Sequence, residues 1–161
     1  MKKTTLLICS LFVLQGLFSQ GIYESYVILN VNSGSDYYYN NAGSSGNTDF
    51  HNHDLGDFSS SNSLTLKGGQ IKAWKDGNCW NLGNPDPSQL LYSINPSDFS
   101  GSMSFSSINL DQTQDLGWPN EVNTSDNESI NLLNGLTPGE YKITVYYTAT
   151  FSCNSGGPVT V

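Results

Sequence analysis

The 161-residue chain carries 14 acidic residues against 6 lysines, contains no arginine, and has a formal net charge of −8 at pH 7. So negative a chain repels phosphate backbones and anionic lipid, and we expect no nucleic-acid binding. The length is that of one domain with a real hydrophobic core, and the abundant Asn, Ser, Thr, Gly and Tyr favour strands and turns over helices.

The N-terminus is typical of a secretory signal peptide. Lys2 and Lys3 form a basic start, and residues 6–14 are apolar but too few to span a bilayer. Residues 17–19 then end in a small side chain at the expected cleavage site. We therefore expect residues 1–19 to be removed. Losing the two lysines changes the net charge from −8 to −8 − 2 = −10.

The remaining residues 20–161 are expected to form a single domain that is secreted or displayed at the cell surface. A lipoprotein anchor at Cys9 is the alternative, although Ile8 is bulky where that motif needs a small residue. No further long apolar run is present, so we expect no transmembrane segment in the mature chain. Cys79 and Cys153 remain after processing and are expected to form a disulfide, the alternative being two buried thiols.

Short alternating runs separated by Gly, Asn, Asp, Ser and Pro clusters predict an all-β fold. The pattern is that of a single antiparallel β-sandwich, immunoglobulin-like or jelly-roll-like. The first expected strand, residues 23–31, is apolar on both faces and should be covered on two sides. Residues 32–47 are expected to be a loop in which residues 37–39 could form a short edge strand.

The stretch SLTLKGGQIKAW predicts a hairpin with Gly68-Gly69 as its two-residue turn, because glycine reaches positive φ at little cost. Pairing across that turn places Trp74, Lys72 and Thr65 together on the polar face. The aliphatic residues of the stretch then share the other face: Leu64, Leu66, Ile71 and Ala73. A large aromatic residue on the polar face is the exception that needs explaining.

Residues 89–94 and 102–110 are the next expected strands. In the second of them the apolar residues change face halfway, which predicts a β-bulge near residues 106–107. Residues 111–127 are expected to form a long polar loop. The strictest alternation follows at residues 141–151, where the odd-numbered residues would point into the core.

Within GLTPGEYKITVYYTA, the Leu-x-Pro-Gly-x-Tyr pattern resembles the entry into a late strand of fibronectin type III and related immunoglobulin-like sandwiches. That resemblance implies that Tyr141 packs at a corner between sheets and hydrogen-bonds to the backbone upstream. Residues 158–161 are the last expected strand.

Three segments together resemble a secreted β-sandwich module of Bacteroidetes bacteria: DLGDFSSSNSLTLKGGQIKAWK, LLYSI…GSMSFSSINL and NLLNGLTPGEYKITVYYTA. The LFSQ that ends the signal is also similar to signals of that phylum. Such accessory modules stand N-terminal to extracellular hydrolases, including nucleases and polysaccharide-degrading enzymes. The resemblance implies a non-catalytic role, and its motifs carry no catalytic residue.

An aromatic residue on the polar face of a strand points to a glycan ligand. Flat sugar faces stack on aromatic rings, while Asn, Asp and Gln side chains supply hydrogen bonds. We therefore expect polysaccharide binding with Trp74 as the stacking platform, Lys72 and Thr65 on the same face, and Trp80 and Trp118 completing the site.

Two other functions stay open. If the loop at residues 111–127 covers Trp74, the aromatic belongs to a secondary core. The chain would then be a structural or protein-interaction module, adhesin-like, or a remnant of a larger secreted hydrolase. An enzyme is not expected. The sequence has no Gly-x-Ser-x-Gly elbow, no phosphate-binding glycine loop before a helix, and no identifiable pair of tuned carboxylates.

Metal sites have weak candidates. If the chain is extended there, His51 and His53 would lie on one face with their backbones about 7 Å apart and could share an ion. Two solvated histidines in a polar loop are the favoured interpretation. A structural calcium could use either of two pairs of neighbouring carboxylates, Asp111 with Asp115 or Asp126 with Glu128, although no EF-hand or nonapeptide spacing is present. No other cofactor is expected.

Overall fold

The computed structural model describes residues 21–43, 46–75, 79–81, 87–116, 120–153 and 157–160. The expected signal peptide, residues 1–19, lies outside these ranges. Within them, no helix is long and apolar enough to cross a membrane.

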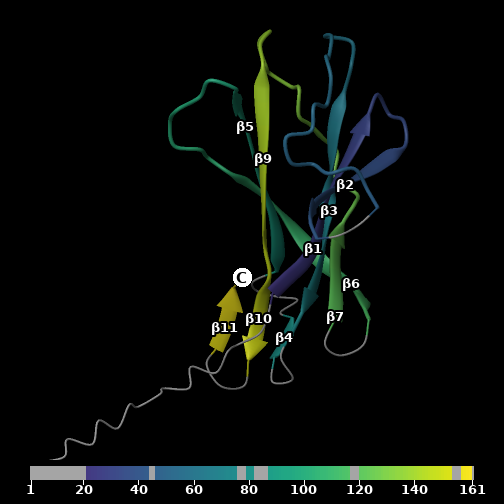
Figure 1. Cartoon of the computed structure of the whole chain (residues 1–161), viewed down its shortest axis with the longest axis vertical. Coiled ribbons are helices and arrows are strands. Elements are labelled where there is room, and N and C mark those ends of the chain that lie inside the picture. The colour runs from purple at the N-terminus through teal and green to yellow at the C-terminus, as the bar shows by residue number, and fades with distance from the viewer. Residues whose placement is uncertain are drawn as a thin grey trace, which may run out of the picture.

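The regular structure of these residues consists of strands (Figure 1). Their bounds are β1 Gly21–Val31, β2 Asp36–Ala42, β3 Leu64–Trp74, β4 Cys79–Asn81, β5 Ser88–Pro96, β6 Ser106–Asp115, β7 Asn120–Ser125, β8 Ile130–Asn131, β9 Tyr141–Thr148, β10 Thr150–Cys153 and β11 Gly157–Thr160.

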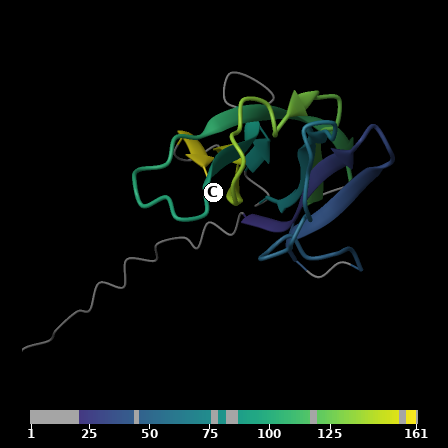
Figure 2. The same ribbon diagram turned by 90° about the horizontal axis from the view of Figure 1, so that it is seen from above.

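The strands form one large sheet and one small sheet. The large sheet has the order β2-β1-β3-β7-β6-β5-β9, with β8 paired to β3, and the small one has the order β11-β10-β4. Strand β6 pairs with β5 through its first half and with β7 through its second half. The sheet curls at this point, so that β5 and β9 form a second layer across from β1 and β3 (Figures 1 and 2). The prediction of an all-β, antiparallel fold is confirmed.

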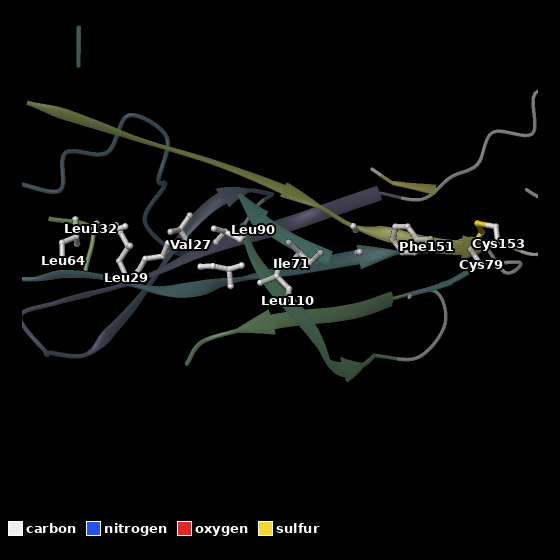
Figure 3. Packing of buried hydrophobic residues seen from close by; sticks show 14 residues of the cluster. Val27, Leu29, Leu64, Ile71, Cys79, Leu90, Leu110, Leu132, Phe151 and Cys153 are labelled. Atoms are coloured by element: carbon white, nitrogen blue, oxygen red, sulfur yellow. A yellow bond between two sulfur atoms is a disulfide. The ribbon is translucent and has the colours of Figure 1, made fainter. Parts of the chain in front are cut away.

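The core fills the inside of the curl (Figure 3). Its fully buried members alternate along β1, β3, β5 and β6, and it continues to Phe151 beside the disulfide. The disulfide predicted between Cys79 and Cys153 is present, with both residues buried. It joins β4 to β10, so it fastens the small sheet to itself at one end of the core.

Several expected strands are confirmed. Residues 23–31 lie in β1, whose centre is buried on both faces, and residues 37–39 lie in the edge strand β2. The alternation at residues 141–151 produces β9 and β10, which are separated by a single residue, Ala149. The Tyr141 hydroxyl donates a hydrogen bond to the Thr137 carbonyl (3.0 Å), as the resemblance to fibronectin-like strands implied.

The prediction of a hairpin at Gly68-Gly69 is wrong, because β3 continues through both glycines without a turn. Instead the register against β1 shifts there: Ile28 pairs with Gly68 and Leu29 with Leu66, which leaves Lys67 as the extra residue of a β-bulge. The extra residue of a bulge shifts by one which residues point to each side of the sheet, and the predicted two-residue turn would have put the same residues on each side. The face assignments therefore hold, with Leu64, Leu66, Ile71 and Ala73 buried in the core: the prediction of faces was correct but its mechanism was not.

The interpretation of residues 102–127 also needs correction. Strand β6 starts only at Ser106, so the bulge predicted at residues 106–107 is absent and Met103 and Phe105 are exposed. Its irregularity lies instead between Gln112 and Gln114. The expected polar loop at residues 111–127 contains the second half of β6 and all of β7. In β7 the polar Asn123 faces the core, where it is buried and donates a 2.8 Å hydrogen bond to the Ser88 hydroxyl, so the composition of this region resembles that of a loop.

Tyr147 joins the two layers, and its titration gives a testable prediction. Its buried hydroxyl donates a 2.6 Å hydrogen bond to the Tyr26 carbonyl, and burial raises the pKa of Tyr147 well above the ordinary 10.0. The unfolded chain ionises near pH 10 while the folded chain keeps its proton. The contribution of Tyr147 to stability is therefore complete below pH 10 and falls as the pH rises beyond it.

We expect Tyr147→Phe to reduce this alkaline loss of stability, while costing about 1 kcal/mol at neutral pH for the lost hydrogen bond. Urea unfolding of both proteins from about pH 8 to about pH 12 measures the effect. Parallel losses of stability above pH 10 in the two proteins would contradict the assignment. Tyr141→Phe, whose hydroxyl bond lies at an exposed position, serves as the control.

Candidate functional site

The side of the large sheet that faces away from the core carries a line of aromatic and polar residues along β1, β2, β3 and β7. We call it the Trp74 face. Its members follow from the strand register, in which directly paired residues share a face. Its polar and aromatic members include Glu24, Tyr26, Asp36, Tyr38, Thr65, Gln70, Lys72, Trp74 and Thr124, and the register also places the buried Ile28 and Val122 on it.

Trp74 lies at one end of this face and is half-buried. It pairs with Gly21 on β1, and a β-carbon placed on Gly21 would lie 3.4 Å from the indole Nε1. The missing side chain at Gly21 thus leaves room for the indole beside β1. The ring is neither fully covered nor fully open, so it keeps a surface that a ligand can contact.

The middle of the face is built around Tyr26, which is 6% exposed yet lies on the side of β1 opposite the core. The Lys72 ammonium lies 5.6 Å from the centroid of its ring and 2.7 Å from a Glu24 carboxylate oxygen. The Tyr38 ring meets Tyr26 edge-on, with ring centroids 6.3 Å apart. Tyr26 is therefore a buried support that fixes the positions of Lys72 and Tyr38.

A row of polar side chains crosses the face next to this support. The Gln70 amide donates to the Thr124 hydroxyl (3.1 Å), and the Thr113 hydroxyl from β6 lies 3.1 Å from the same oxygen. Hydroxyl and amide groups held in this way provide donors and acceptors at fixed positions. Such groups fix the orientation of a polar ligand.

Tyr38 marks the other end of the face and is 38% exposed. Burial, followed by the charges of Asp126 and Asp36, raises the pKa of Tyr38. A hollow of about 430 Å³ opens beside it, within the range typical of ligand sites. It is lined by Asp36, Tyr37, Tyr38, Gly46, Asn47 and Thr48. This hollow is open to solvent, which suits a polymer lying across it better than an enclosed small molecule.

The half-buried Trp74 and the exposed Tyr38 lie far apart. Trp74 pairs with Gly21 and Tyr38 pairs with Ile28 on the same strand. Seven residues of strand separate these partners, so the distance along β1 is roughly 20 Å. A single sugar ring is too short to touch both, whereas an extended oligosaccharide can.

The predicted site is assembled only in part. Lys72 and Trp74 share the face as predicted. Thr65 lies on the same face but pairs with Asn30 at the far end, because without the hairpin it is seven residues from Lys72 along one strand. Trp80 has its backbone in β4, but its side chain lies outside the described part of the molecule, as does the whole of Trp118.

The geometry predicted for a shared histidine metal site is wrong. Asn52 has a φ of 55°, and the His53 amide donates to the Phe50 carbonyl (3.1 Å), so residues 50–53 form a turn instead of an extended segment. His53 stacks near Tyr39 at a centroid distance of 5.2 Å. In the described ranges, no three His, Cys, Asp or Glu residues cluster as metal ligands.

The carboxylates proposed for calcium are likewise not gathered in the described residues. Asp111 is exposed on β6, and the side chain of Asp115 lies outside them. Glu128 accepts a 3.4 Å hydrogen bond from the Ser125 hydroxyl.

Sequence reasoning missed Glu24, Tyr26, Tyr38 and Gln70 as parts of the site. Residues 24, 26 and 28 alternate outward from the same strand, which was the available signal. This alternation could not be interpreted as part of a site, because the sequence did not reveal that β1 pairs with β3. The predicted hairpin had instead paired the two halves of β3 with each other.

Comparison with protein-family profiles, with curated proteins and with solved structures gives no match to this chain. The functional argument therefore depends on the geometry of the Trp74 face.

Proposed function

We propose that this protein is a non-catalytic module that binds polysaccharide outside the cytoplasm through the Trp74 face. One observation carries the proposal: Trp74 and Tyr38 stand at opposite ends of a sheet face whose middle is lined with amide and hydroxyl groups. Aromatic rings stack on the apolar faces of sugar rings, and the polar row supplies hydrogen bonds between them.

The properties of the face favour glycan over other extended ligands. A single nucleic-acid strand would also stack on aromatic rings, but it needs a basic groove, and the chain has a net charge of −8. The apolar residues at the centre of the face, Tyr26, Ile28 and Val122, are already buried within the chain, so they are not available to form the apolar centre of a protein interface.

The disulfide supports the proposed location outside the cytoplasm. Cys79 and Cys153 are joined, and structural disulfides persist in oxidising environments such as the periplasm and the extracellular space. The basic and apolar N-terminus and the resemblance to secreted accessory modules support the same compartment.

The central prediction concerns the two aromatic residues at the ends of the face, Tyr38 and Trp74. Tyr38→Ala and Trp74→Ala are each expected to weaken binding by at least about tenfold, because removing an aromatic that anchors a ligand costs about 2 kcal/mol. Affinity electrophoresis against a panel of plant, algal and bacterial polysaccharides identifies the ligand and measures the loss.

Tyr146→Ala is the matched control. Tyr146 is 57% exposed and lies on β9, in the other layer of the curl, so its removal should leave polysaccharide binding unchanged. Circular dichroism checks that each variant keeps its strands. Retention of wild-type affinity by both Tyr38→Ala and Trp74→Ala would rule out the Trp74 face as the binding site.

A protein-interaction module is the second candidate, and a different surface favours it. Phe99, Met103 and Phe105 are exposed on the loop between β5 and β6, and the Phe105 ring lies 5.3 Å from that of Tyr146. Exposed apolar clusters of this kind mark contact sites. If that candidate is correct, Tyr146→Ala and Phe105→Ala will abolish binding of the protein partner, whereas Tyr38→Ala will leave that binding intact.

A further inference from the structure

The Trp74 face carries more negative than positive side chains. Glu24 and Asp36 lie on β1 and β2, Asp126 follows β7, and Lys72 on β3 is the counter-charge. The β-bulge at Lys67 lies toward the Tyr38 end of the face and adds one charge of each sign, those of Lys67 and Glu128. These two residues are adjacent, because the backbone amide of Glu128 donates to the Lys67 carbonyl at 3.1 Å. Carboxylates therefore outnumber ammonium groups around the path from Trp74 to Tyr38.

Lys72 offers an anionic ligand no uncompensated positive charge, because it is paired with Glu24. Its ammonium lies 2.7 Å from the Glu24 carboxylate and above the Tyr26 ring, with the carboxylate side chain 14% exposed. A bound anion would have to displace Glu24 from this pair or lie beside it. In both cases the local charge that the anion meets is neutral or negative.

The Tyr38 end is negative as well. Asp36 lines the hollow there, where its carboxylate accepts a 2.7 Å hydrogen bond from the Asn30 amide. Asp126 is exposed and lies close enough for its charge to act on the Tyr38 hydroxyl. A carboxylate or sulfate on a sugar stacked against Tyr38 would face both.

We infer that the Trp74 face selects uncharged polysaccharides and rejects anionic ones, with Glu24, Asp36 and Asp126 as the residues that determine this specificity. The inference depends on the proposed glycan-binding function and adds the chemical class of the ligand to it. Its physical basis is like-charge repulsion, which suppresses the wrong partner more than it strengthens the right one.

The test uses one polysaccharide in two forms: a neutral polymer that the wild-type protein binds and the same polymer after carboxymethylation. The wild-type protein should bind the neutral form at least about tenfold more tightly at low salt, because like charges at an interface are costly. Binding to the neutral form should not depend on salt. Residual binding to the carboxymethylated form should strengthen as salt shortens the screening length from about 30 Å to about 8 Å.

Glu24→Gln releases Lys72 and is expected to reduce the preference for the neutral form at least about threefold. Glu140→Gln makes the same change in net charge at an exposed residue that contacts Ser97, away from the face, and should leave the preference unchanged. Equal effects of the two substitutions would overturn the assignment to these residues.

The two levels of the proposal fail differently. If no polysaccharide in either form binds, the proposed glycan-binding function is wrong. If the carboxymethylated form binds as tightly as the neutral one, or binds less as salt is added, glycan binding stands and the selectivity inference is wrong.

Discussion

Replacing both Cys79 and Cys153 by alanine is expected to lower the free energy of unfolding by about 4 kcal/mol in the chain-entropy description of a disulfide. The two residues are 74 positions apart, so the bond removes much of the conformational freedom of the unfolded chain. It joins β4 to β10, strands of only three and four residues. Most domains are stable by only about 5–15 kcal/mol, so the variant should be close to unfolding at physiological temperature.

Urea unfolding under non-reducing conditions measures this effect. The wild-type protein treated with a reductant is the control, and it should unfold at nearly the same urea concentration as the double variant. Alanine is chosen because both positions are buried and serine would bury a hydroxyl group. An unfolding midpoint for the double variant equal to that of the oxidised wild type would show that the bond does not stabilise the fold.

Gly68→Ala is the second substitution with a large expected effect, at about 3 kcal/mol of lost stability. Gly68 has a φ of +130°, where side chains are strained, and an added β-carbon would meet the backbone oxygen of Ser125 on β7. Gly69→Ala should cost less, about 1–2 kcal/mol. Its β-carbon would lie 2.6 Å from Leu90 Cδ1 and from the Tyr147 hydroxyl, so it would displace buried side chains but would not meet backbone atoms as Gly68→Ala does.

Gly46→Ala is the matched control, because nothing lies within 4 Å of a β-carbon there. The free energies of unfolding of the three variants should rank Gly46→Ala as most stable, then Gly69→Ala, then Gly68→Ala. If Gly68→Ala were as stable as Gly46→Ala, the bulge in β3 would be in the wrong place.

These glycines also show where prediction from sequence stops. A Gly-Gly pair between two alternating runs fits a hairpin turn and a β-bulge equally well, and both restore the same inward face. The choice is made by contacts of Gly68 with Ser125 and of Gly69 with Leu90 and Tyr147, which are between 21 and 78 residues away in the chain. Local pattern carries no information on such contacts.

Features that depend on local pattern were predictable. The alternation of residues 141–151 gives β9 and β10, and the resemblance to fibronectin-like strands implied the hydrogen bond from Tyr141 to the backbone at Thr137. The second half of β6 and the whole of β7 were missed because their residues are mostly Asp, Gln, Thr and Asn, and even the core side of β7 carries Asn123. Their backbone pairing to each other and to β3 is non-local and leaves no trace in composition.

The candidate site divides in the same way. Trp74 and Lys72 were predictable because the polar face of β3 follows from its own alternation. Tyr26, Glu24 and Tyr38 join them only through the register of β1 with β2 and β3, which places Glu24 opposite Lys72 and Tyr38 opposite Ile28.

The indole N–H resonance of Trp74, followed by NMR while a neutral oligosaccharide is added, tests the central claim most directly. Binding at the Trp74 face should shift this resonance together with the backbone amides of Gln70 and Lys72, and should leave the amide of Tyr146 unchanged. The opposite pattern, with Tyr146 and Phe105 shifting while the Trp74 indole stays in place, would contradict the account.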